Sequence, residues 1–238
     1  MIEWNQSLSL TMKYSYRFVF ITALFVTCLL TANIVAVKVW GAGSFFLPAA
    51  VIVFPFSYIF GDVLTEVYGY HQARRVIWLG FLCNLIFVIF AWLGQILPPA
   101  PLWTGQKAYL AVLGYTPRLL AASFVGYLVG EFANSFVLAK MKILTKGKWL
   151  WSRTISSTIV GEGLDTAIFI LGAYLGAAFF TPWMILWHWG AKVAIEVIFT
   201  PLTYVIVNYL KKSEGMDTYD TGTNFNPLRI NGGKSKTR

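Results

Sequence analysis

Charged side chains are scarce in this sequence, and the scarcity excludes whole classes of protein. Asp, Glu, Lys and Arg make up 12% of the 238 residues, while apolar residues make up 57% and the mean hydropathy is +0.63. A soluble domain usually carries about 25% charged residues. The composition therefore excludes a disordered chain and argues against an ordinary soluble enzyme, and it predicts an integral membrane protein.

The motifs of common enzymes and metal proteins are also missing. The two cysteines, Cys28 and Cys83, lie within apolar stretches, so we expect neither to belong to a disulfide framework or a metal cluster. The sequence has no phosphate-binding glycine loop followed by Lys-Ser/Thr, no His-Glu-x-x-His motif and no Gly-x-Ser-x-Gly elbow. We therefore expect no metal and no cofactor, and a protein that is not an enzyme. A weaker hypothesis, an intramembrane enzyme, has no specific flanking sequence in its favour.

Six apolar segments follow one another and are typical of membrane helices. They cover residues 18–37, 45 to the polar pair Gly61-Asp62, 76–97, 119–139, 155–180 and 184–210. A spanning helix needs about 20 apolar residues, whereas the strands of a membrane barrel alternate in polarity. The sequence thus predicts an all-α, polytopic membrane protein with six transmembrane helices within residues 18–210. Residues 1–17 are expected as a cytoplasmic N-terminal segment, and residues 211–238, rich in Gly, Thr and Asn, as a solvated cytoplasmic tail.

The distribution of basic residues predicts the orientation. If both termini are cytoplasmic, fifteen of the nineteen Lys and Arg residues fall on the cytoplasmic side, and the outer loops hold only Lys107 and Arg118. Basic residues concentrate in the cytoplasmic loops of membrane proteins. The net charge of +9 is therefore interpreted as a signal of topology, and no nucleic-acid partner is expected.

Six of the ten acidic residues lie inside or beside the apolar segments. They are Asp62, Glu66, Glu131, Glu162, Asp165 and Glu196. An ionised group at the centre of a bilayer costs about 2.5–3.5 kcal/mol, so such residues are expected to face a polar interior or to have partners. Residues three or four positions apart share a helix face. This spacing places Asp62 and Glu66 on one helix face and Glu162 and Asp165 on another. It also suggests an ion pair between Lys192 and Glu196.

Several of these residues have two interpretations. Glu66 precedes Tyr68-Gly69-Tyr70 and basic residues, so a position at the cytoplasmic interface is an alternative to a substrate role. The pair of Lys192 and Glu196 is alternatively a structural bridge. Gly161 and Gly163, just before Asp165, favour a locally unwound helix that lines a cavity, as in transporters with broken helices.

The second apolar segment carries the most specific motif. Residues 54–70, FPFSYIFGDVLTEVYGY, followed by Ala73-Arg74-Arg75, resemble the signature of the queuosine precursor transporters, also called the vitamin uptake transporter family. Residues 32–38, 161–166 and 192–202 resemble the family too, and residues 217–227 resemble the C-terminal extension of some members. The resemblance runs over nearly the whole chain.

The resemblance implies a multi-pass importer in the bacterial cell membrane, carrying 7-cyano-7-deazaguanine or 7-aminomethyl-7-deazaguanine. A carboxylate can accept hydrogen bonds from the ring N–H and the amine of a guanine-like edge together, and an amide or ammonium can serve its carbonyl oxygen. Aromatic rings can stack on the base. The residues expected to bind the substrate are Asn33, Lys38, Phe56, Tyr58, Asp62, Glu66, Glu162, Asp165, Lys192 and Glu196.

The sequence leaves the mode of transport open. A second hypothesis is a substrate-binding subunit that works with a separate ATPase and a coupling protein, since the chain has no ATPase motif of its own. Which precursor is carried, the energy source and the oligomeric state are not determined. Protonatable carboxylates inside the membrane are compatible with proton coupling.

Overall fold

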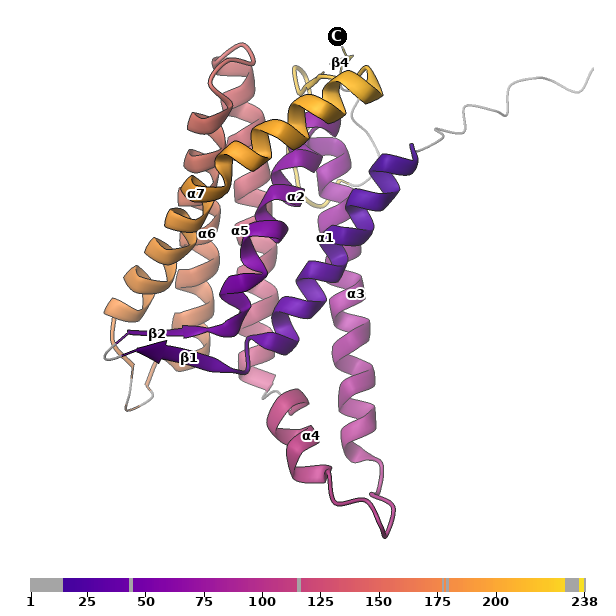
Figure 1. The fold of residues 1–238 in the computed structure, drawn as a ribbon, viewed down its shortest axis with the longest axis vertical. Helices are drawn as coiled ribbons and strands as arrows, with labels where there is room; N and C mark the ends of the chain where they lie inside the picture. The colour runs from indigo at the N-terminus through magenta and orange to yellow at the C-terminus, as the bar shows by residue number, and fades with distance from the viewer. Residues whose placement is uncertain are drawn as a thin grey trace, which may run out of the picture.

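The computed structural model describes residues 15–42, 45–114, 117–176, 178, 180–229 and 236–237. In these residues an elongated bundle of α-helices makes up the main body (Figure 1). The helices are α1 (Tyr16–Val35), α2 (Phe54–Tyr68), α3 (Tyr70–Ile96), α4 (Gln106–Leu113), α5 (Pro117–Leu144), α6 (Leu150–Tyr174) and α7 (Trp183–Glu214). The predicted all-α class therefore holds for the bundle.

Short strands occur at the two ends of the bundle, although the sequence indicated none. Strand β1 (Val39–Ala42) pairs antiparallel with β2 (Phe45–Pro48), and the 3-10 helix η1 (Ala49–Ile52) follows. In the tail, β3 (Thr218–Tyr219) pairs with β4 (Lys236–Thr237). We call the end of the bundle that holds β1 and β2 the hairpin end, and the end where α7 meets the C-terminal tail the tail end (Figure 1).

Five stretches are long and apolar enough to cross a membrane. They are α1, α3, α6, α7 and the stretch Gln106–Leu144, which contains α4 and α5. Helix α2 has 15 residues and rises about 22 Å at 1.5 Å per residue, less than the roughly 30 Å of a hydrocarbon layer. Helix α2 begins only at Phe54, whereas the predicted second span begins at residue 45, and this late start explains why five and not six long apolar stretches are found among the described residues. Pro55 occupies the first turn, where the missing N–H costs nothing, and the preceding residues form the hairpin and η1.

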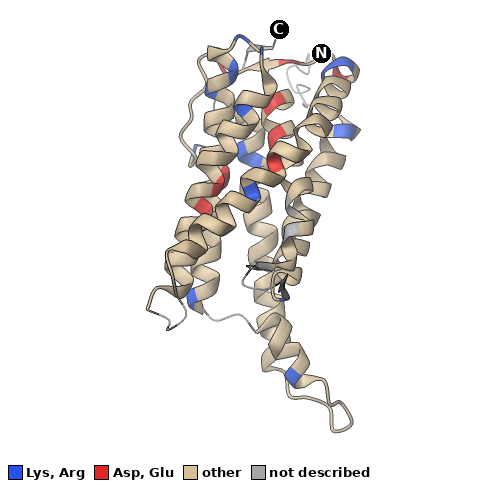
Figure 2. Ribbon diagram, turned by 60° about the vertical axis from the view of Figure 1, so that its left-hand side comes forward, with Lys and Arg blue, Asp and Glu red and all other residues tan. Residues whose placement is uncertain are grey.

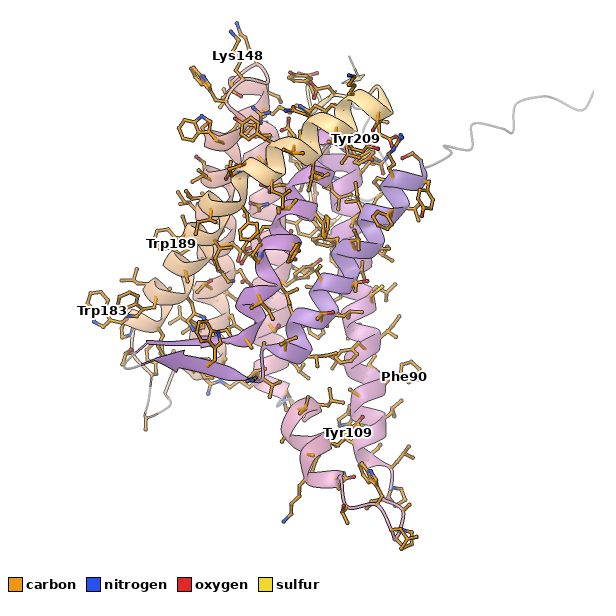
Figure 3. All side chains as sticks on the ribbon, viewed as in Figure 1. Phe90, Tyr109, Lys148, Trp183, Trp189 and Tyr209 are labelled. Atoms are coloured by element: carbon orange, nitrogen blue, oxygen red, sulfur yellow. The ribbon has the colours of Figure 1, made fainter. Side chains whose placement is uncertain are left out.

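Large apolar side chains cover the outside of the long helices. Phe90 on α3 is 68% exposed and points away from the bundle (Figure 3), and Tyr209 on α7 is 61% exposed. Extended apolar surface of this kind is unusual on a soluble monomer and suits contact with lipid. The outer surface thus agrees with a polytopic membrane protein.

Close packing of α5 against α6 depends on glycine. A Cβ added to Gly161 would lie 2.6 Å from Cβ of Asn134, and one added to Gly130 would lie 2.7 Å from Cβ of Asp165. Helix α6 runs without a break through Gly161 and Gly163, so the prediction of an unwound segment is wrong. Small residues let two membrane helices approach, and that need explains these glycines.

The C-terminal tail folds back onto the tail end of the bundle. An oxygen of Asp220 accepts a hydrogen bond from the backbone N–H of Tyr70 at 2.9 Å, and Arg74 donates to the carbonyl of Asn224 at 2.9 Å. The rings of Phe225 and Tyr70 are in contact, with centroids 4.9 Å apart. The expectation of a solvated tail is therefore wrong for the described residues up to 229. Residues 1–14 of the expected N-terminal segment, and residues 230–235 and 238 of the tail, lie outside the described residues.

Basic residues gather at the tail end. They occur near the start of α1, α3 and α6 and near the end of α5 and α7: Arg17, Arg74, Arg75, Arg153, Lys140, Lys142, Lys211 and Lys212. The hairpin end has few, among them Lys107 and Arg118 (Figure 2). If the tail end is cytoplasmic, the arrangement obeys the positive-inside rule. That orientation stays a prediction.

Candidate functional site

A cavity of about 1030 Å³ lies toward the hairpin end of the bundle. Its walls come from the end of α1, the start of α2, the middle of α3, the start of α5, the end of α6 and the start of α7. Most of the lining is apolar. The polar lining residues include Asn33, Ser57, Asn84, Ser123, Glu131, Glu162, Asp165, Thr166, His188 and Lys192. An apolar cavity with a few convergent polar groups is typical of a site for a small molecule.

One ammonium group joins two carboxylates in the wall of this cavity. Nζ of Lys192 on α7 lies 2.7 Å from Oε2 of Glu162 and 2.7 Å from Oδ2 of Asp165, both on α6. The hydroxyl of Tyr58 on α2 donates to the same oxygen of Glu162 at 3.2 Å. We call these four residues the cavity cluster. Two carboxylates face one lysine, so the cluster carries an excess of acceptors.

The predicted pair of Lys192 and Glu196 does not form. Lys192 reaches across to the carboxylates of α6, which offer two charged partners in place of one. Glu196 is 1% exposed, and neither of its carboxylate oxygens has a hydrogen-bond partner among the described residues. The alternative interpretation, a structural bridge between these two residues, is wrong for the same reason.

A second pair of polar residues lines the part of the cavity wall that α1 and α3 form. Nδ2 of Asn33 on α1 donates to Oδ1 of Asn84 on α3 at 2.8 Å. Asn33 was expected in the site and Asn84 was not, although an amide inside the apolar segment 76–97 is a detectable signal. Glu131 also lines the cavity, and so do Trp187 and His188, which belonged to no expected site.

Lys38 and Phe56 are not among the residues that line the cavity. Lys38 follows the end of α1 and is exposed, and Phe56 is 46% exposed and faces Phe199 with ring centroids 6.4 Å apart. Residues two positions apart on a helix point about 200° away from each other. Because Tyr58 faces the cavity, Phe56 faces outward.

Asp62 and Glu66 lie deeper in the bundle, outside the cavity lining. Both are fully buried. Oδ1 of Asp62 accepts from Nδ2 of Asn134 on α5 at 2.9 Å, and Oδ2 has no partner among the described residues. Tyr58, Asp62 and Glu66 follow at intervals of four, so one face of α2 carries a polar group on three successive turns.

Glu66 is the centre of a group of ion pairs at the tail end. Arg153 donates to its two oxygens at 2.9 and 2.7 Å, and Nζ of Lys211 lies 2.5 Å from Oε1. Lys142 lies 3.4 Å from the same oxygen and 2.6 Å from Asp217 of the tail. We call these five residues the tail-end cluster. The alternative interpretation placed Glu66 at the cytoplasmic interface, and Glu66 does lie at the end of the bundle that is expected to be cytoplasmic. That interpretation did not predict that the side chain of Glu66 is completely buried.

Comparison with known proteins identifies the family. Residues 48–206, more than half of the chain, match the family described as "Putative vitamin uptake transporter". The "Probable queuosine precursor transporter" of Bacillus subtilis (strain 168) is 29% identical over 64% of this chain and 68% of that protein. The "Queuosine precursor transporter" of Escherichia coli (strain K12) is 26% identical over 73% of this chain and 74% of that protein.

The "Probable queuosine precursor transporter" of Haemophilus influenzae is 24% identical over 66% of this chain and 63% of that protein. No solved structure matches the chain. The family match and the apolar helices identify a multi-pass transporter of the bacterial cell membrane, not an enzyme. The motifs in the sequence thus indicated the right group, and the chain belongs to the vitamin uptake transporter family.

Proposed function

We propose that this protein imports queuosine precursors, 7-cyano-7-deazaguanine or 7-aminomethyl-7-deazaguanine, and binds them in the cavity beside the cavity cluster. The observation that carries the proposal is the meeting of Lys192 with Glu162 and Asp165 in the wall of a largely apolar cavity. The names of the relatives support the class of substrate. A cavity of about 1030 Å³ has room for a bicyclic base.

The chemistry of the cluster suits the edge of a guanine-like base. That edge presents a ring N–H beside an exocyclic amine, and a carboxylate accepts hydrogen bonds from both. We assign Asp165 to this contact because its side chain is 26% exposed, against 11% for Glu162. Lys192 then serves as the donor nearest to the carbonyl oxygen of the base.

Two further contacts complete the proposed site. Tyr58 lines the cavity, and we assign its ring to stacking on the base, a contact that contributes about 1–3 kcal/mol per base on aromatic platforms. The amides of Asn33 and Asn84 supply a polar surface on the wall formed by α1 and α3. Lys38, Phe56, Asp62, Glu66 and Glu196 are not assigned to the substrate, because they lie outside the lining.

The position of the cavity suggests a route for the substrate. The cavity lies toward the hairpin end, while the tail-end cluster and the tail close the opposite end. With the tail end in the cytoplasm, a base enters from outside and leaves when the tail-end cluster separates. Alternation of this kind around a central site is the general mechanism of secondary transporters.

Reconstitution of the purified chain in liposomes tests the proposal. We expect saturable uptake of a labelled base without any partner protein, loss of uptake in Asp165→Asn, and normal uptake in Glu214→Gln. Glu214 is a matched acidic control, since it lies at the end of α7 and pairs with Arg17. Binding without transport until an ATPase and a coupling protein are added would instead establish the binding-subunit function. Failure of the wild type to bind either base would overturn the proposal.

A further inference from the structure

Three buried carboxylate oxygens, on two acidic side chains of the bundle, have no hydrogen-bond partner among the described residues. Oδ2 of Asp62 and both oxygens of Glu196 accept no hydrogen bond from any described residue. Asp62 is 0% exposed and Glu196 is 1% exposed. The two groups come from different helices, α2 and α7, which pack against each other. We call Asp62 and Glu196 the middle pair.

The middle pair lies between the two clusters of ion pairs. On α2, Asp62 is one turn from Tyr58 of the cavity cluster and one turn from Glu66 of the tail-end cluster. On α7, Glu196 is one turn from Lys192. Figure 2 shows acidic positions at successive levels of the bundle. A charge that moves from the cavity toward the tail end therefore passes the level of this pair.

The surrounding charges do not neutralise the pair. Glu131 and Glu66 act electrostatically on Asp62, and Glu162 acts on Glu196, so these neighbours are acidic. The nearby cations are already engaged. Lys192 binds Glu162 and Asp165, and the tail-end cations Arg153, Lys142 and Lys211 surround Glu66. Asn134 donates one hydrogen bond to Asp62, and its own Oδ1 has no partner among the described residues.

Two ionised carboxylates cannot persist in such a place. Burial of an unpaired charge costs several kcal/mol, and two carboxylates in one site repel each other, so one of them takes up a proton. A proton bound to either carboxyl group removes one of the two charges. Ca²⁺ and Mg²⁺ usually take six or more oxygen ligands. The described residues offer four unpartnered oxygens here: Oδ2 of Asp62, both carboxylate oxygens of Glu196 and Oδ1 of Asn134.

We propose that Asp62 and Glu196 form a proton-binding site separate from the substrate cavity, through which import is coupled to the proton gradient. A solvent proton arriving from the cavity forms the O–H bond of one carboxyl group, and the same bond breaks when the proton leaves toward the tail end. The coupling part of this proposal rests on the proposed import function. The protonation part stands without it.

Infrared difference spectroscopy tests the protonation without any substrate. In sodium-free detergent at pH 7, we expect the wild type to show the C=O band of a protonated carboxyl group that Asp62→Asn/Glu196→Gln lacks. Glu214→Gln should keep the band. An unchanged band in the double variant would overturn the proposal. The proposal would also be overturned if the band disappears when the choline salt of the sodium-free buffer is replaced by a sodium salt, because that result would assign the site to sodium.

Transport in liposomes tests the coupling. With the membrane potential clamped, a gradient of one pH unit supports up to about tenfold accumulation of the neutral cyano base at one proton per base. We expect the wild type and Glu214→Gln to accumulate the base, and Asp62→Asn/Glu196→Gln to exchange it across the membrane without accumulation. Accumulation by the double variant would overturn the coupling. Absence of exchange in the wild type would refute the proposed function, while the infrared result still decides the proton site.

Discussion

Arg153 and Glu66 form a two-point ion pair in the interior of the bundle. Nε of Arg153 donates to Oε2 of Glu66 at 2.9 Å and Nη2 donates to Oε1 at 2.7 Å. The side chains are 1% and 0% exposed. The pair ties α6 to α2 at the tail end, and Lys142 and Lys211 extend it to Asp217 of the tail. The tail end is thus held by charge pairs rather than by apolar packing alone.

We expect Arg153→Ala to destabilise the protein strongly. Removal of one partner from a buried pair costs up to about 3–5 kcal/mol, and here Lys142 and Lys211 still compensate part of the Glu66 charge. Arg153→Lys should recover only part of the loss, since a lysine cannot donate at two points. Thermal unfolding in detergent measures the effect. Lys148→Ala is the control, because Lys148 is exposed and points away from the bundle (Figure 3). Wild-type stability in Arg153→Ala would show that the pair does not hold the tail end.

Glycine at the interface of α5 and α6 allows a sharp comparison. Gly161→Ala places a methyl group 2.6 Å from Cβ of Asn134 and should cost about 1–3 kcal/mol by overpacking. Gly190→Ala, on α7, meets no atom within 4 Å and should be neutral or slightly stabilising. Thermal unfolding of both variants and the wild type in the same detergent measures the difference in stability. Equal stability of the two variants would contradict the close packing of these helices.

The docking of the tail should depend on a hydrogen bond to the start of α3. Asp220 accepts the N–H of Tyr70 at 2.9 Å with one oxygen and the hydroxyl of Thr223 at 2.9 Å with the other. Loss of a hydrogen bond that leaves a buried donor without a partner costs about 1–3 kcal/mol, so Asp220→Ala should lower stability. Asp220→Asn should retain much of it, because the amide oxygen can accept the same bond from Tyr70. An Asp220→Ala variant as stable as the wild type, with the tail equally resistant to protease, would exclude this role.

Acid should weaken the same docking through Asp217. Burial alone would raise the pKa of Asp217, but hydrogen bonds from Lys142 and Lys211 outweigh burial and hold its pKa below the ordinary value. A lowered folded-state pKa contributes stability that is full above the unfolded pKa of about 3.9 and is lost as the pH falls through the folded value. We therefore expect Asp217→Asn to reduce the melting temperature at neutral pH, with a difference that shrinks in acid. A difference independent of pH would contradict the ion pairs.

The helices were predictable because each has to satisfy its backbone inside an apolar layer. The continuous apolar runs located α1, α3, α5, α6 and α7, with bounds that differ from the helix ends by up to six residues. The second span was not located correctly, since hydropathy cannot show that residues 45–52 form a strand and a 3-10 helix before α2 begins. A polar composition likewise could not show that the tail packs on the bundle, because its contacts join residues about 150 positions apart.

The types of residue in the site were predictable from the sequence, but the ion pairs that these residues form between helices were not. Spacing along one helix reveals neighbours such as Glu162 and Asp165, which share a face of α6. It does not reveal which helix lies opposite, so Lys192 was paired with Glu196 when its partners are on α6. The same limitation hid the separation of Asp62 and Glu66 from the cavity. Their places depend on how α2 packs against α5, α6 and α7.

The most direct test of the account is equilibrium binding of the two 7-deazaguanine bases to the purified protein and to Asp165→Asn. Loss of a hydrogen bond to a charged group costs about 1.5–3 kcal/mol, so we expect Asp165→Asn to bind roughly 10- to 150-fold more weakly. Glu214→Gln should bind as the wild type does. Equal affinity of Asp165→Asn and the wild type would contradict the assignment of the cavity cluster to the substrate.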